Sequence, residues 1–277
     1  MSLGICLKGP EGIVLAADSR VTLFHPISAQ NLYVPATYDN ATKLLSLSSQ
    51  PFVGMVTYGL GAIGQTDFRT PYSLLPELDN ELPQPRKRMI ISDFAKSVSG
   101  FFMKQWASKM PKVYTGDAIR FIVAGYDQGE LYGKVFWFSV PYKPDPIEYY
   151  PNSFGILYDG QCDFVYRLLR GYDENLIPQI KEVLSLTDDN VAKLMADLSS
   201  KSQVSLPLQF LPLQDCVDLA MFLIRTTISM QTFLPTIRGV GGPVDVATIV
   251  RTEGFKALQQ KSVRAAKPTL SFEGLLP

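Results

Sequence analysis

The chain has 277 residues, 46% of them hydrophobic, and its 26 basic and 26 acidic residues give a net charge of zero. A chain of this length and hydrophobicity can bury a sizeable core. The charge balance gives no reason to expect nucleic acid or a membrane surface as a partner. One histidine and three widely spaced cysteines do not match the usual zinc-ligand patterns, so we expect no metal and no cofactor.

The cysteines and the N-terminus both favour a cytoplasmic protein. Three cysteines without a CxxC pair are typical of reduced, buried thiols: Cys6, Cys162 and Cys216. No basic segment followed by an apolar run comes after Met1, so we expect no secretory signal. The most apolar segment, residues 219–230, contains Arg225 and is too short to span a bilayer.

The predicted elements begin with two short apolar strands, residues 4–8 and 13–17, joined by the turn Gly9-Pro10-Glu11-Gly12. The second strand consists of β-branched and small residues without strict alternation, which predicts burial on both faces. It ends in Asp18-Ser19-Arg20, which delivers charged side chains to an edge or the floor of the sheet.

Two further strands follow in the first sixty residues. Lys43 stands just before one of them, and residues 52–61 form another that runs into a glycine-rich turn. Residues 92–110 have a helical apolar stripe, with Ser92 as the expected N-cap and Pro111 at the end.

The rest of the chain alternates between strands and helices, which alone supports only an α+β fold. The proline-rich residues 142–151 are predicted to be a loop. The other expected elements are strands at 119–126, 131–140 and 153–158, helices at 163–170, 176–184, 188–198 and 213–230, and a closing hairpin of 244–250 with 255–258.

Ser2 directly follows Met1, and removal of Met1 would leave it with a free α-amine beside its own Oγ. That places a nucleophile and a general base on one residue. An α-amine titrates at about 7.7–8.0, so part of it is neutral near pH 7. Serine at this position is common in proteins and means little by itself.

The surrounding motifs give Ser2 its significance. They are Gly12-Ile13-Val14-Leu15-Ala16-Ala17-Asp18-Ser19-Arg20, Lys43 before a strand, the glycine-rich turn after Tyr58, and Gly241-Gly242-Pro243-Val244-Asp245-Val246-Ala247-Thr248-Ile249-Val250. Their order resembles the β-type proteasome subunits and their bacterial and archaeal relatives, which are N-terminal nucleophile hydrolases. The resemblance runs from Ser2 to about Phe255, and Ser2 falls where the family has its N-terminal threonine.

The resemblance implies an architecture and an assembly. The fold would be α+β, a four-layer αββα sandwich of two antiparallel sheets. One domain would cover residues 1–277, with a longer loop at about 21–42 and an extra helical segment at about 163–212. A homo-oligomer is expected, as in proteasome relatives.

The resemblance also implies roles for five residues in a peptidase or amidohydrolase related to the threonine peptidases. Ser2 Oγ would attack a peptide or amide carbonyl, and the Ser2 α-amine would take its proton. Lys43 would lie near both groups, Asp18 would keep Lys43 charged and oriented, and Arg20 would brace this network. The backbone N–H of Gly59 would supply the oxyanion hole. The single histidine, His25, is predicted to lie in a loop and to carry no proton.

The chain also departs from the family pattern. Serine replaces threonine, so the methyl group that restricts the rotamer of a β-branched residue is missing. The Asp and Ser that support the amine are replaced by Arg238-Gly239-Val240-Gly241-Gly242, and Asp159 or Gln161 could substitute.

Two alternatives to a hydrolase remain open. In a transpeptidase or ligase relative, a second amine instead of water would resolve the acyl-enzyme. In a non-catalytic assembly subunit, the fold alone would be kept. An α-type proteasome subunit would carry an N-terminal helical extension before its first strand, and this sequence has none, which argues against that form of the second alternative.

Overall fold

The computed structural model describes residues 2–26, 33–83 and 87–262, with the backbone alone for 24–26 and 33–35. Met1 and residues 27–32 of the predicted long loop lie outside the described residues. One sheet contains β1 (Leu3–Lys8), β2 (Ile13–Ala17), β10 (Gly155–Gly160), β11 (Asp245–Val250) and β12 (Gly254–Gln259). The second contains β5 (Leu44–Leu45), β6 (Val53–Gly59), β7 (Ile119–Gly125), β8 (Lys134–Val140) and β9 (Lys143–Tyr149).

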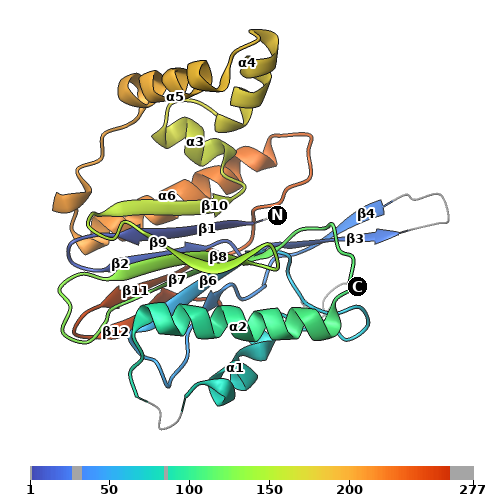
Figure 1. The fold of residues 1–277 in the computed structure, drawn as a ribbon, viewed down its shortest axis with the longest axis vertical. Coiled ribbons are helices and arrows are strands. Elements are labelled where there is room, and N and C mark those ends of the chain that lie inside the picture. The colour runs from blue at the N-terminus through green and yellow to red at the C-terminus, as the bar shows by residue number, and fades with distance from the viewer. Residues whose placement is uncertain (1, 27–32, 84–86, 263–277) are drawn as a thin grey trace, which may run out of the picture.

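The two sheets are antiparallel and lie face to face, with helices outside each (Figure 1). Their strand orders are β10-β1-β2-β11-β12 and β5-β6-β7-β8-β9. The helices are α1 (Leu75–Glu81), α2 (Ile91–Lys109), α3 (Asp163–Leu169), α4 (Ile177–Val183), α5 (Asp188–Ser202) and α6 (Leu213–Thr232). α6 covers the first sheet and α2 covers the second.

Three clusters of buried apolar side chains fill the three gaps between these four layers. One joins α2 to the second sheet, one joins α3 and α6 to the first sheet, and one lies between the sheets. The predicted α+β sandwich of layers αββα is therefore confirmed.

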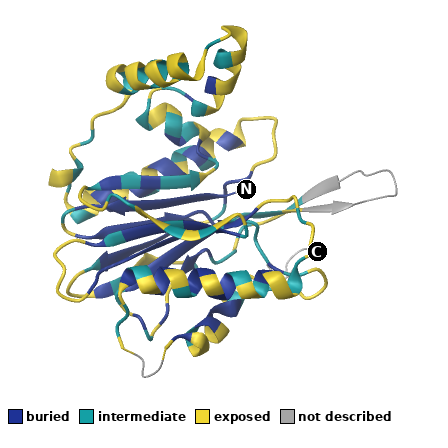
Figure 2. Ribbon diagram, in the orientation of Figure 1, coloured by how far each residue is buried: buried dark blue, intermediate teal, exposed yellow. Residues whose placement is uncertain are grey.

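The strand predicted at residues 13–17 is confirmed as β2, which is buried along its whole length. It lies between β1 and β11 in the sheet, and its two faces contact α6 and the second sheet (Figure 2). Burial on both faces explains why its sequence does not alternate.

The helix predicted at 92–110 forms α2, but its start differs from the prediction. Ser92 lies inside the helix, and the residue before the helix is Ile90. The carboxylate of Asp127 accepts a hydrogen bond from the N–H of Ile91 at 2.7 Å. A side chain distant in sequence therefore accepts a hydrogen bond from a free N–H group at the helix start, the role expected of Ser92.

The loop prediction for residues 142–151 is wrong, because β9 occupies most of this segment. β9 lies at the edge of its sheet. An edge strand tolerates proline because some of its backbone groups need no partner. Pro144 and Pro146 therefore do not prevent strand formation here.

The segment predicted as a long loop at about 21–42 carries a hairpin of β3 (Val21–Pro26) and β4 (Tyr33–Tyr38). In this hairpin Val21 pairs with Tyr38. In the segment 163–212, α3 packs against α6, while α4 and α5 lie farther from the sheets (Figure 1). Among the described helices, none is both long and apolar enough to cross a membrane.

Candidate active site

The ends of three strands bring Ser2, Asp18 and Lys43 to one edge of the sandwich. Ser2 precedes β1 and Asp18 follows β2, and these neighbouring strands pair antiparallel with Gly4 opposite Ala17. Lys43 precedes β5 in the second sheet. Its long side chain thus connects the two sheets.

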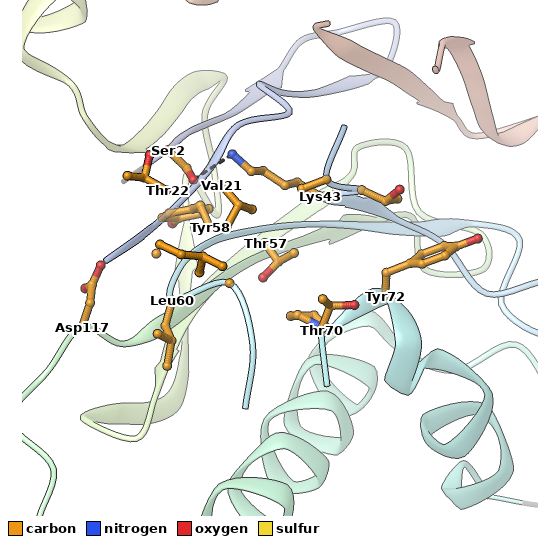
Figure 3. A pocket seen from close by; sticks show the side chains of 16 residues that line it. Ser2, Val21, Thr22, Lys43, Thr57, Tyr58, Leu60, Thr70, Tyr72 and Asp117 are labelled. Atoms are coloured by element: carbon orange, nitrogen blue, oxygen red, sulfur yellow. Dashed lines mark hydrogen bonds between the residues drawn. The ribbon is translucent and has the colours of Figure 1, made fainter. Parts of the chain in front are cut away.

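The ammonium group of Lys43 forms hydrogen bonds with both other residues. Its Nζ donates to Ser2 Oγ at 2.8 Å and to Asp18 Oδ1 at 2.7 Å. Figure 3 shows the Lys43 side chain directed at Ser2. Residue exposure is 3% for Ser2, 4% for Lys43 and 0% for Asp18, so this hydrogen-bonded group is almost free of solvent.

Backbone N–H groups hold the carboxylate of Asp18 in place. Leu3 donates to Oδ1, and Arg20 and Gly241 donate to Oδ2, each at 3.0 Å. Together with the Lys43 ammonium, these donors compensate the buried carboxylate. Backbone from three separate segments therefore fixes Asp18, and Asp18 in turn orients Lys43.

Burial lowers the pKa of the Lys43 ammonium below its usual value, because desolvation disfavours its charged form. The negative charge of Asp18 and its hydrogen bond oppose this shift. A charge on Lys43 would stabilise negative charge that develops on Ser2 Oγ.

A cavity of about 300 Å³ opens beside Ser2 (Figure 3). Its walls include apolar side chains from the start of β3 and from the segment after β6, namely Val21, Leu23, Leu60, Pro71 and Tyr72. Thr57 also lines it, and this residue is 4% exposed. In the part of the chain that the structure describes, its Oγ1 has no hydrogen-bond partner. Thr22 Oγ1 is likewise buried and without a partner among the described residues, so two lining threonines carry unsatisfied hydroxyl groups.

Gly59 forms the end of β6 and lies on the wall of the same cavity. Its φ is +87°, a conformation that residues with a side chain rarely adopt. A Cβ here would lie 2.2 Å from the carbonyl oxygen of Ala118. Both observations require glycine at this position.

Arg20, expected to brace the network, contacts it through its backbone, while its guanidinium binds Asp39. Nε donates to Asp39 Oδ1 at 2.5 Å and Nη2 donates to Asp39 Oδ2 at 2.7 Å. The pairing of Val21 with Tyr38 places Arg20 and Asp39 side by side at the base of the hairpin. Only the backbone N–H of Arg20 supports Asp18.

The carboxylate of Asp159, considered as a support for the amine, has other partners. Oδ2 accepts from Tyr58 Oη at 3.0 Å and from Trp137 Nε1 at 2.9 Å. Oδ1 accepts from the N–H of Gly160 at 2.6 Å. These bonds join β10 to β6 and β8, so Asp159 links the two sheets.

Gln161 lies closer to the N-terminus, since its backbone N–H donates to the Ser2 carbonyl at 2.8 Å. Its side-chain oxygen accepts from Gln231 Nε2 at 2.9 Å. The backbone N–H of Gly241 donates to Asp18. Residues 238–242, which stand where the family has its amine-supporting Asp and Ser, therefore contact the Asp18 carboxylate. Gln161, Gln231 and Gly241 were not assigned these contacts from sequence, and no local motif indicates them.

The three cysteines are poor candidates for the nucleophile. The cysteines are free and buried, and burial raises the pKa of each thiol, that of Cys216 to about 11. Thiolates are therefore scarce at neutral pH. His25 lies in β3, where the prediction had a loop. In the described ranges, no three His, Cys, Asp or Glu residues are placed to hold a metal ion.

Sequence reasoning missed two residues near the site, Thr57 and Asp39. Thr57 is part of the strand predicted at 52–61, and the observed strand β6 is buried at every residue but the last, so no alternation in the sequence sets Thr57 apart. Asp39 could not be found, because its place depends on the hairpin register in a segment predicted as a loop.

Comparison with known proteins finds similarity only among solved structures. No family model matches the chain, and no curated protein matches it either. The Gly-1 mutant of Anbu from Hyphomicrobium sp. strain MC1 is similar with a TM-score of 0.50 and 15% sequence identity, over 94% of this chain and 86% of that one. Anbu from Yersinia bercovieri, titled as an ancestral beta-subunit, gives a TM-score of 0.49 at 15% identity, over 92% and 87% of the two chains.

These findings correct the family identification made from the sequence. The motifs suggested a β-type proteasome subunit, but no family model and no curated sequence supports membership. At 15% identity, a structural likeness shows the fold alone. The comparisons therefore establish that this chain has an α+β fold shared with Anbu from Hyphomicrobium.

Proposed function

We propose that this protein is an N-terminal nucleophile hydrolase in which Ser2 Oγ attacks a peptide or amide carbonyl after Met1 has been removed. One observation carries the proposal: Lys43 Nζ donates to both Ser2 Oγ and Asp18 Oδ1, in a buried group beside a cavity. The serine of this group is the residue that would carry the free α-amine, and it lines the cavity.

The first half of the reaction forms an acyl-enzyme. The Ser2 α-amine takes the proton of Oγ, directly or through one water, while the Lys43 ammonium stabilises the developing alkoxide. Oγ bonds to the carbonyl carbon, and the carbonyl oxygen becomes an oxyanion that accepts a hydrogen bond from the N–H of Gly59. The intermediate collapses as the α-ammonium returns its proton to the leaving amine, which leaves an ester on Ser2.

The second half removes the acyl group. A water molecule loses a proton to the α-amine and attacks the ester, and Oγ leaves with that proton, so the enzyme is restored and a carboxylic acid is released. A second amine in place of water would give a transpeptidase. Ser2, Lys43, Asp18 and Gly59 would have the same roles in either case.

A peptide α′,β′-epoxyketone tests the proposal sharply. Its ketone carbon and its epoxide carbon can react with the hydroxyl and the amine of one N-terminal residue, which closes a morpholine ring. We expect one adduct on Ser2, located by mass spectrometry of the N-terminal peptide. Ser2→Ala should give no adduct, because it keeps the amine and loses Oγ. Ser48→Ala, at an exposed serine, is the matched control and should react like wild type.

Three results would contradict the proposal. They are an adduct on Cys6 or Cys162, an unchanged adduct in Ser2→Ala, and no adduct on wild type with any of a broad panel of epoxyketones that differ in their side chains. The last result, in protein shown to lack Met1, would favour the non-catalytic assembly subunit.

A further inference from the structure

A second buried ion pair lies behind the Ser2 site. The carboxylate of Asp245, the first residue of β11, has no solvent exposure, and the Lys261 side chain is 13% exposed. Lys261 Nζ donates to Asp245 Oδ2, and the Lys261 backbone N–H donates to Oδ1 at 3.1 Å. The same Nζ donates to Ser19 Oγ at 2.8 Å.

The strand pairing places this second pair next to the first. β11 pairs with β2 so that Asp245 lies opposite Ala17, the residue before Asp18. Ser19, which Lys261 contacts, directly follows Asp18, and its N–H donates to the Gly241 carbonyl at 3.0 Å. Lys261 therefore holds the turn that carries Asp18 through Ser19, a residue that Lys43 does not hydrogen-bond among the contacts described.

We propose that Lys261 is a positioning residue for the Ser2 site, which it serves by fixing the Asp18–Ser19 turn and by placing a second cation behind Lys43. The inference rests on the proposed function for its catalytic consequence. Lys261 lies in the segment after β12, for which no motif predicted a role.

The charges around Lys43 determine what removal of Lys261 would do. Asp18 faces Lys43 directly, Asp245 and Lys261 lie behind it, and the pKa of Asp39 is lowered in part by Lys43. Lys261 lowers the pKa of Lys43, and Asp245 raises it. Loss of the Lys261 charge alone should therefore raise the pKa of Lys43, and loss of the Asp245 charge alone should lower it.

The first test measures the titration of Lys43 without requiring activity. Lysine is labelled with ¹³C at Cε, and the Lys43 resonance is assigned from its absence in Lys43→Arg. We expect Lys261→Met to shift the titration of Lys43 to higher pH and Asp245→Asn to shift it to lower pH. Lys256→Met, at an exposed lysine of β12, should leave it unchanged. An unchanged Lys43 titration in both site variants, or shifts of the opposite sign, would overturn the inference.

The second test follows the rate of epoxyketone adduct formation against pH. We expect its alkaline limb to move to higher pH in Lys261→Met and to lower pH in Asp245→Asn. In Lys261→Arg, which keeps the charge, the limb should lie where it lies in wild type. If Lys261→Met fails to fold, the inference is still tested by Asp245→Asn, which should move the limb to lower pH, and by Lys261→Arg, which should leave it at its wild-type position. Wild type without any adduct would defeat the proposed function, whereas an adduct whose pH profile ignores both charges would defeat this inference alone.

Discussion

The guanidinium of Arg20 binds both carboxylate oxygens of Asp39, with 2.5 Å between Nε and Oδ1 and 2.7 Å between Nη2 and Oδ2. The backbone N–H of Arg20 meanwhile donates to Asp18. One residue thus joins the site to the base of the β3–β4 hairpin. Val21 and Thr22 of this hairpin line the cavity, so the ion pair holds part of the cavity wall.

Asp39→Asn should lower the free energy of unfolding at neutral pH and should lower it less in acid. The hydrogen bond from Arg20 lowers the pKa of the Asp39 carboxyl. A carboxyl whose pKa is lower in the folded state stabilises the protein at pH values above its unfolded pKa of about 3.9. This contribution is lost as the pH falls through the folded-state pKa. Because the Asp39 side chain is 41% exposed, we expect a loss of at most about 1 kcal/mol.

Urea unfolding of wild type and Asp39→Asn at neutral pH and at about pH 3 measures this difference. The gap between the two proteins should shrink in acid. Asp145→Asn, at an exposed aspartate, serves as the control. A gap that stays constant with pH would show that the Arg20–Asp39 charge pair does not stabilise the hairpin.

Thr57→Val should raise the stability of the fold while leaving the reactivity of Ser2 unchanged. The substitution keeps the side-chain shape and removes a buried Oγ1 that has no partner among the described residues. A buried hydroxyl without a hydrogen bond costs about 1–3 kcal/mol, so its removal should raise the free energy of unfolding by up to that amount.

Urea unfolding of wild type and Thr57→Val measures this change. The rate of epoxyketone adduct formation should be the same in the two proteins. A lower stability of Thr57→Val would show that Oγ1 has a hydrogen-bond partner in the folded protein.

Local pattern predicted most of the fold. The unalternated apolar run at residues 13–17 gave β2 with its observed bounds, and the 3.6-residue periodicity gave α2. The failures came from tertiary context. Proline is compatible with β9 only because that strand lies at an edge, and the start of α2 is capped by Asp127, which is 36 residues away from Ile91.

Chain order nominated Ser2, Asp18 and Lys43, and the structure brings their side chains within hydrogen-bonding distance. Their catalytic roles remain predictions. The partner of Arg20 could not be foreseen, because it depends on the register of the β3–β4 hairpin. Lys261 contacts Ser19 across 242 residues of sequence, and nothing local indicates such a contact.

Removal of Met1 is the first requirement of the proposed function. The small side chain of Ser2 should allow an aminopeptidase to act, so the intact mass of protein made in cells should lack one methionine. Periodate on the denatured protein provides a second readout, because it cleaves the Cα–Cβ bond of an N-terminal serine to give a glyoxylyl group. Full reactivity of a population that uniformly retains Met1 would exclude the Ser2 amine as the base.

A homo-oligomer is expected in solution. Large apolar side chains are exposed on and after α6, with 53% exposure at Phe222 and 81% at Phe233. Exposed apolar groups of this size favour association when the net charge is near zero. Light scattering at micromolar concentration should give a multiple of the 30.8 kDa chain mass. A monomer throughout this range would contradict the expectation.

Lys43→Met should abolish adduct formation nearly as completely as Ser2→Ala, because Oγ and the amine both lose their charged neighbour. We expect at least about a hundredfold loss, since groups that act as a unit show non-additive effects. The variant also leaves Asp18 buried without its cation, which costs about 3–5 kcal/mol and can unfold the protein.

The double variant Asp18→Asn with Lys43→Met separates these two effects. It removes both charges, so its stability should recover in part while its reactivity should not. Recovery is partial because an amide nitrogen cannot accept the backbone N–H bonds that one of the two Asp18 oxygens accepts. His25→Ala should react within a small factor of wild type, because the mechanism gives His25 no proton to carry. In wild type the adduct rate should be bell-shaped with pH, rising as the α-amine becomes neutral and falling as Lys43 loses its proton. Because burial lowers the pKa of Lys43 from 10.5, the alkaline limb should lie below that value. A double variant as reactive as wild type would remove Lys43 from the mechanism.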